Sequence, residues 1–204
     1  MSGLRLAVGS AVVFAAMAVL FTAPHDYFVQ ATFVATGCMI IVAFALEGIG
    51  LPHELKIKPI AIGLGSALFL YLVFLGGAWM VATFHPLGIT SALETSIYSL
   101  IASPSNPQYL QVAVLLFDAA GYESFFRGIL QRKLTPRIGV GSAVVVAVVD
   151  ALLHVISLNP LWVGATFVTD LVWGLAYRYG NGRTASFTSH FVWDIAIFIL
   201  RPVT

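Results

Sequence analysis

The chain has 204 residues, of which 59% are hydrophobic and only 9% are charged, and its mean hydropathy is +0.95. A soluble domain of this length would carry roughly a quarter charged residues, so this composition excludes a soluble globular protein and predicts a polytopic integral membrane protein. The single cysteine, Cys38, lies in an apolar run and has no partner for an internal disulfide or a paired-cysteine metal site. The sequence shows no basic, aromatic groove, and no nucleic-acid partner is expected.

Seven apolar segments are long enough to cross a bilayer, for which about 20 residues are needed. In chain order they cover residues 4–22, 27–48, 59–84, 108–134, 138–156, 161–179 and 184–200. No internal repeat or low-complexity tract divides the chain. The sequence therefore predicts an all-α transmembrane helix bundle of about seven spans, built as a single domain over residues 1–204, with the lipid bilayer as its surroundings.

Turn-forming residues separate these segments. The first pair is broken by the stretch 23–26 around Pro24, the second by residues 50–53, and the fourth span is followed by Thr135-Pro136. The segment 85–102 is too polar to span, yet its apolar residues recur at helical spacing. We expect it to form a short helix at the membrane interface.

The cationic side chains indicate the orientation. They fall in alternate loops or next to them: Lys56 and Lys58, then Arg132, Lys133 and Arg137, then Arg178 and Arg183. The remaining loops hold no Lys or Arg, and Arg5 lies at the start of the first span. Cations accumulate on the inner side of a membrane, so the N-terminus is predicted inside, with Arg201 alone on the wrong side. A prokaryotic cytoplasmic membrane fits this pattern.

Charged residues interrupt the fourth segment at Asp118, Glu123 and Arg127. On a helix Glu123 and Arg127 are one turn apart and face the same way, as do Asp118 and Tyr122. Each such group costs roughly 2.5–3.5 kcal/mol on membrane-insertion scales, so it normally points into the bundle and carries a function. The alternative is a structural pair that holds the helix in register.

Two later segments repeat an acid and a histidine at one-turn spacing. Asp150 precedes His154, and His190 precedes Asp194. A carboxylate that accepts from an imidazole N–H fixes its tautomer and supports general-base chemistry. A lone histidine on an apolar helix is as often a core or interface residue. Asp170 is given no role; it could be a further acid or a partner of polar groups near Arg178.

The same residues leave a metal-dependent site open. Two histidines with Glu123 and one or more aspartates would satisfy zinc by number. The chain has no H-E-x-x-H helix motif, however, and His154 and His190 are far apart in sequence. No cofactor is expected, with zinc as the alternative.

Taken in order, three motifs resemble the CPBP family, which comprises CAAX prenyl proteases and bacteriocin-processing enzymes and is also called Abi. The family carries E-E-x-x-x-R on one transmembrane helix, F-x-x-x-H on the next, and H-x-x-x-N or H-x-x-x-D near the end. The matching stretches here are 122–127, 150–154 and 190–194, and the resemblance covers roughly residues 55–198.

The resemblance implies a role for each matching residue. Glu123 takes the position of the second glutamate, which pairs with Arg127 and shapes the site. His154 takes the position of the histidine that helps to activate water. His190 and Asp194 take the positions that stabilise the oxyanion. Such a glutamate- and histidine-dependent endopeptidase would cleave a membrane-anchored peptide or CAAX-like substrate.

Tyr122 departs from the family pattern, because it stands where the water-activating glutamate belongs. A phenol with a pKa near 10 is a poor general base at neutral pH. Asp118 or Asp150, each one turn before a motif residue, are possible substitute acids. Two hypotheses follow: an intramembrane peptidase, or an inactive relative that serves as a scaffold or accessory subunit of a membrane complex.

Overall fold

The computed structural model describes residues 3–48, 56–84, 91–101 and 106–200. Within these ranges every regular element is a helix, which confirms the predicted all-α class. The predicted break at residues 50–53, the first residue of the family-like core at position 55, and Arg201 lie outside the described residues.

Each of the seven apolar segments coincides with a helix to within a few residues. The first three are α1 (Gly3–Thr22), α2 (Phe28–Glu47, preceded by the short turn η1, His25–Tyr27) and α3 (Ile57–Phe84). The fourth is a continuous run of α5 (Gln108–Tyr122), the π-helical stretch η3 (Glu123–Gln131) and α6 (Arg132–Ile138). Then follow α7 (Gly141–His154) with η4 (Val155–Ser157), α8 (Pro160–Tyr179), and α9 (Arg183–Asp194) with the π-helical η5 (Ile195–Leu200). The short helix predicted within residues 85–102 is α4 (Ser91–Ile101).

Among the described residues, three helices are long and apolar enough to cross a membrane: Gly3–Thr22, His25–Glu47 and Ile57–Phe84. The count of seven spans and the inside position of the N-terminus stay predictions.

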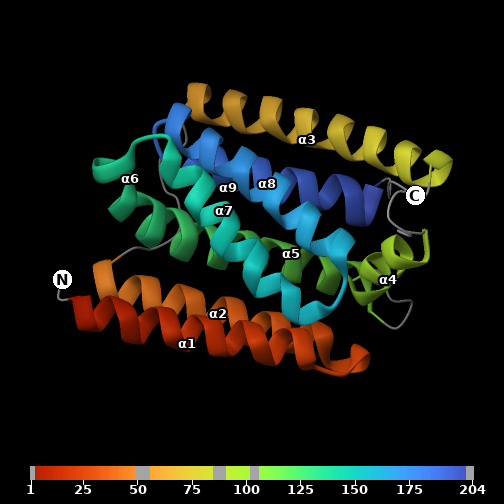
Figure 1. The fold of residues 1–204 in the computed structure, drawn as a ribbon, viewed down its shortest axis with the longest axis horizontal. Coiled ribbons are helices and arrows are strands. Elements are labelled where there is room, and N and C mark those ends of the chain that lie inside the picture. The colour runs from red at the N-terminus through yellow and green to blue at the C-terminus, as the bar shows by residue number, and fades with distance from the viewer. Residues whose placement is uncertain (1–2, 49–55, 85–90, 102–105, 201–204) are drawn as a thin grey trace.

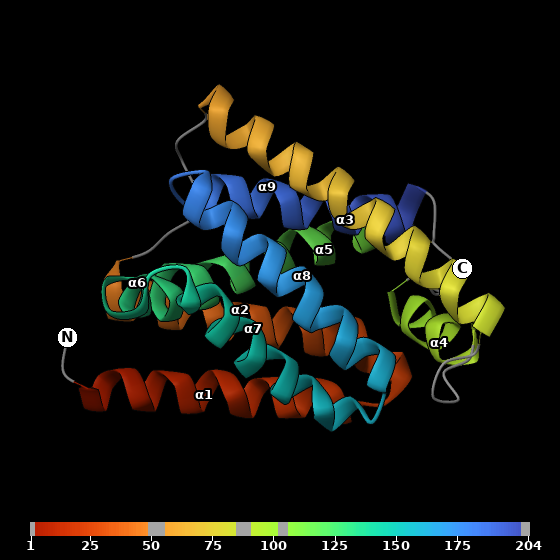
Figure 2. The same ribbon diagram turned by 45° about the horizontal axis from the view of Figure 1, so that its top comes forward.

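The helices form a bundle with outer and inner members. Helix α3 runs along one side and the α1–α2 pair along the opposite side, with α5, α7, α8 and α9 between them (Figure 1). Helix α3 packs on α9, α2 on α5, and α7 on α8. Helix α8 crosses the bundle obliquely, and α4 lies at the end opposite α6 (Figure 2). The inner helices carry the polar residues, so the arrangement places them away from the surface.

The sequence sets several helix ends directly. Asn159 caps α8 by accepting from the backbone N–H groups of Leu161 and Trp162, at 3.0 and 3.2 Å, and Pro160 follows at the first helical position, where its missing N–H has no cost. Helix α2 stops at Gly48, whose left-handed φ of +63° glycine adopts without strain.

One predicted helix end was wrong. The Thr135-Pro136 pair was expected to follow the fourth span, but α6 continues through Pro136 to Ile138 and stops at Gly139. Pro136 removes one backbone N–H donor from this short helix, but the helix continues past it. Arg132, Lys133 and Arg137 therefore lie on a helix and not in a loop.

A glycine brings the site helix close to its neighbour. A Cβ at Gly121 would lie 2.8 Å from both the Cβ and the carbonyl oxygen of Thr36 on α2. Small residues let membrane helices approach this closely. The contact fixes α5 against α2 immediately before Tyr122 and Glu123.

Candidate functional site

The helix α5–η3 supplies three of the ionisable residues. Asp118 lies on α5 with its side chain 24% exposed, whereas Glu123 and Arg127 lie in η3 and are each 1% exposed. The π-helical stretch is buried almost throughout. Such turns are rare and often mark functional positions in helices.

Arg127 is held mainly by Asp170 of α8. Its Nη2 donates to Asp170 Oδ1 and, at 3.2 Å, to the Asp170 carbonyl oxygen, while Nη1 lies 3.4 Å from Oδ2. Arg127 Nε lies 3.7 Å from Glu123 Oε2, which is an ion pair but too long for a hydrogen bond. The predicted Glu123–Arg127 contact is present, but Asp170 is the closer partner.

From the sequence Asp170 had no assigned role, and the structure pairs it with Arg127. Asp170 is fully buried against Arg127. A buried charge of this kind needs a partner with direct hydrogen bonds. Sequence reasoning missed the pair because the two residues lie on different helices, 43 positions apart.

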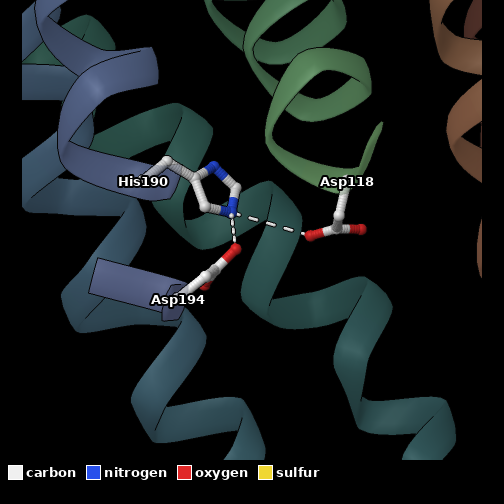
Figure 3. A group of neighbouring side chains, drawn as sticks. All are labelled: Asp118, His190 and Asp194. Carbon is white, nitrogen blue, oxygen red and sulfur yellow. Dashed lines mark ion pairs between the residues drawn. The ribbon is translucent and has the colours of Figure 1, made fainter. Parts of the chain in front are cut away.

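His190 of α9 lies among three carboxylates. Its Nδ1 is 3.3 Å from Glu123 Oε1. On the other side of the ring, Nε2 faces Asp118 Oδ2 at 3.6 Å and Asp194 Oδ2 at 3.5 Å (Figure 3). The hydrogen-bonding partner of the imidazole is thus Glu123, and not Asp194 as the one-turn spacing suggested.

Trp173 of α8 stacks on the same imidazole. The two ring centroids are 3.6 Å apart, with an angle of 13° between the planes. The stack fixes the ring orientation of His190, so its two nitrogen atoms point in set directions. Asp170 and Trp173 are three residues apart and therefore share a face of α8. This spacing was the feature of the sequence that could have indicated that both residues face the site.

His154 at the end of α7 keeps its predicted neighbour. Its Nδ1 lies 3.0 Å from the carbonyl oxygen of Asp150 and 3.5 Å from Oδ1 of the same residue. The ring also packs on Phe21 and Trp162, with centroids 4.5 and 5.6 Å away. Both His154 and Asp150 are buried.

One cavity of about 410 Å³ joins these groups. Its polar lining includes Asp118, Asp150, His154, His190 and Asp194, and the rest is largely apolar. A volume of this size lies in the range of small-molecule and peptide side-chain pockets. The structure therefore brings together the two predicted acid–histidine pairs and both candidate substitute acids.

Glu123 and Arg127 stand apart from this cavity. Neither belongs to its lining, and Glu123 reaches it only through its contact with His190. Within the described chain, Glu123 Oε2 and Arg127 Nε have no hydrogen-bond partner. Glu123 and Arg127 are thus placed to support the His190 imidazole from the side that faces away from the cavity.

The hydroxyl of Tyr122 contacts a methionine on another helix. The phenol O–H donates to Met17 Sδ on α1 at 3.4 Å, and the ring stacks on Phe126 with centroids 5.2 Å apart. Tyr122 also packs in the largest apolar cluster of the core. The hydroxyl therefore lies against a thioether, while the ring packs edge-on against His190, with centroids 5.9 Å apart, and lines the cavity.

Comparison with known proteins gives one match. Residues 104–196 match the model of the family described as type II CAAX prenyl endopeptidase Rce1-like. No curated protein and no solved structure gives a significant match. The matched stretch contains all three motifs and every aspartate and histidine of the cavity. This match confirms the resemblance of the site region to the CPBP family, through the Rce1-like model. Together with the apolar helices it supports an integral membrane protein.

Proposed function

We propose that this protein is an intramembrane endopeptidase that hydrolyses a peptide bond in a membrane-anchored peptide or CAAX-like substrate. The observation that carries the proposal is the cavity, which gathers three aspartates and two histidines between apolar walls. An apolar cavity accommodates a lipid-like or apolar segment of a substrate, and the polar groups supply acid–base chemistry.

Asp118 takes the role of the missing glutamate. It lies one turn before Tyr122, opens onto the cavity and faces His190. Its carboxylate removes a proton from water as the water oxygen attacks the carbonyl carbon. The carbon–nitrogen bond then breaks, and the leaving amine takes up a proton. His154 lines the same cavity and is held by Asp150, which suits its protonated form to deliver that proton. The proton taken up by Asp118 then passes to His154 through water in the cavity and restores both groups.

The orientation is part of the proposal. Glu47 at the end of α2 pairs with Arg132, at 2.6 Å, and with Lys133 on α6, so the ends of these helices meet on one side of the bundle. This supports seven spans with the cation-rich side and the N-terminus facing the inside of a prokaryotic cytoplasmic membrane.

Cleavage of farnesylated CAAX-like peptides by the purified protein in proteoliposomes tests the proposal. We expect Asp118→Asn and His154→Ala each to lower the rate by about 10²–10⁴-fold, the usual contribution of a general acid or base. Asp26→Asn is the matched control, because this carboxylate is 95% exposed and outside the cavity. Full activity in Asp118→Asn would exclude the assigned role.

The position of Tyr122 favours a second function, that of an inactive relative acting as a scaffold or subunit. Its hydroxyl contacts Met17 and leaves the glutamate position without an acid. Co-purification of stoichiometric partner proteins, retained in Glu123→Gln and His190→Ala together with normal cell function, would establish this alternative. Loss of function in these variants without loss of the partners would argue for catalysis.

A further inference from the structure

The imidazole of His190 faces an unusual arrangement on its Nε2 side. Nδ1 lies within hydrogen-bonding distance of Glu123 Oε1, and because a carboxylate only accepts, Nδ1 carries the proton in this contact. In the neutral ring Nε2 then has a lone pair, which points toward oxygen atoms of Asp118 and Asp194 (Figure 3). The lone pair of Nε2 thus faces one carboxylate oxygen of Asp118 and one of Asp194, and all three atoms are electron-rich.

The distances do not suit hydrogen bonds. The contacts of 3.6 and 3.5 Å from Nε2 are longer than the 3.3 Å contact from Nδ1 to Glu123, and N–H···O bonds weaken beyond about 3.2 Å. Asp194 Oδ2 is buried and has no hydrogen-bond partner in the described part of the chain. A buried acceptor without a hydrogen bond is costly, so this side of the cluster needs a positive charge, which either a proton on Nε2 or a bound cation would supply.

A metal ion fits the spacing. Four-coordinate zinc binds nitrogen and oxygen at about 2.0–2.2 Å, which places neighbouring ligand atoms about 3.3–3.5 Å apart. The distances from Nε2 to the two carboxylate oxygens are close to this ligand–ligand distance. All three ligand atoms lie within 4.8 Å of one another. One imidazole and two carboxylates form a donor set that divalent transition metals accept.

We infer that Asp118, His190 and Asp194 form a binding site for a divalent transition metal ion of the zinc type. Glu123 would hold the non-ligating nitrogen of His190, as a carboxylate does behind many metal-bound histidines. The stack on Trp173 keeps the ring in this direction. Three protein ligands leave a further position, on the cavity side, for water or substrate.

The consequence for catalysis rests on the proposed peptidase function. An ion with an open position makes its bound water acidic enough to lose a proton near neutral pH. That water would give its proton to His154, and its oxygen would then attack the substrate carbonyl. The proton returns to the amine as the carbon–nitrogen bond breaks. In this arrangement Asp118 holds the ion, and the metal-bound water with His154 takes the place of direct proton abstraction by the Asp118 carboxylate.

Metal analysis of the full-length protein tests the site without any substrate. The protein is purified in detergent, stripped with a chelator and titrated with zinc or cobalt(II). Bound metal is counted by elemental analysis and, for cobalt, followed by visible absorption. We expect one ion per chain with a tetrahedral cobalt spectrum, weakened about 10–100-fold by Glu123→Gln and more strongly by Asp118→Asn or Asp194→Asn.

Asp150→Asn is the matched control, because Asp150 is a carboxylate of the same cavity that lies outside the cluster, and its metal binding should equal that of the unaltered protein. Asp118→Asn is the decisive variant, since this side chain is partly exposed and its loss leaves the core packing intact. Equal metal binding by Asp118→Asn and the unaltered protein, or less than stoichiometric metal in both, would overturn the inference. Cleavage of peptides by the metal-free protein would overturn the catalytic role of the ion and leave the peptidase proposal standing. Stoichiometric metal without cleavage would support the site and argue against the peptidase proposal.

Discussion

Replacement of Asp170 by asparagine tests whether the buried pair with Arg127 supports the fold. Both side chains are 1% exposed or less, and removal of one partner from such a pair costs about 3–5 kcal/mol because the other charge stays buried. Glu123 remains 3.7 Å from the guanidinium, and the carbonyl oxygen of residue 170 still accepts from it, so the lower end, about 3 kcal/mol, is expected. For a chain of this size that corresponds to a fall in melting temperature of about 6–12 °C.

Thermal unfolding of the purified protein in detergent, followed by tryptophan fluorescence, measures this change. Glu47→Gln is the control, because it breaks ion pairs with Arg132 and Lys133 that are partly exposed and worth about 0–1 kcal/mol each. If Asp170→Asn melts no lower than Glu47→Gln, then the buried pair does not stabilise the bundle and the reasoning fails.

Two further substitutions address the neighbourhood of the site. Gly121→Ala should destabilise the protein by about 1–3 kcal/mol through overpacking, because the new methyl group meets Thr36 at 2.8 Å. Gly65→Ala, where a Cβ meets nothing within 4 Å, should not lower the melting temperature, because alanine favours the helix interior over glycine. Equal melting of the two variants would contradict the contact. Tyr122→Phe should retain peptide cleavage and lose about 1 kcal/mol of stability or less, because only the weak bond to Met17 is removed; a 100-fold fall in cleavage rate would show instead that the phenol takes part in the chemistry.

The helical segments were predictable because each is a long apolar run bounded by turn residues. The error at Pro136 arose because a proline marks a helix end by preference only, and in α6 the chain continues for two residues to the left-handed Gly139. The π-helical stretch 123–131 could not be foreseen, since its widened hydrogen-bond pattern leaves no characteristic side-chain period in the sequence.

The sequence predicted which residues belong to the candidate site better than it predicted which of them contact one another. Spacing along one helix indicated the contact of His154 with Asp150, and the structure contains it. The contacts of Glu123 with His190 and of Arg127 with Asp170 join different helices. Such contacts depend on how the helices pack, which neither periodicity nor spacing specifies. The catalytic and binding roles of these residues stay predictions.

The π-helical stretch from Glu123 to Gln131 also affects how related sequences should be aligned. A π-helical turn holds one more residue than an α-helical turn, and each residue rotates an α-helix by about 100°. Deletion of one residue here would restore a regular α-helix and swing Gln131 away from the Gly174 carbonyl oxygen to which it donates. A one-residue gap inside this helix would therefore signal a different geometry between Asp118 and the end of the helix, even in a sequence that kept every motif residue.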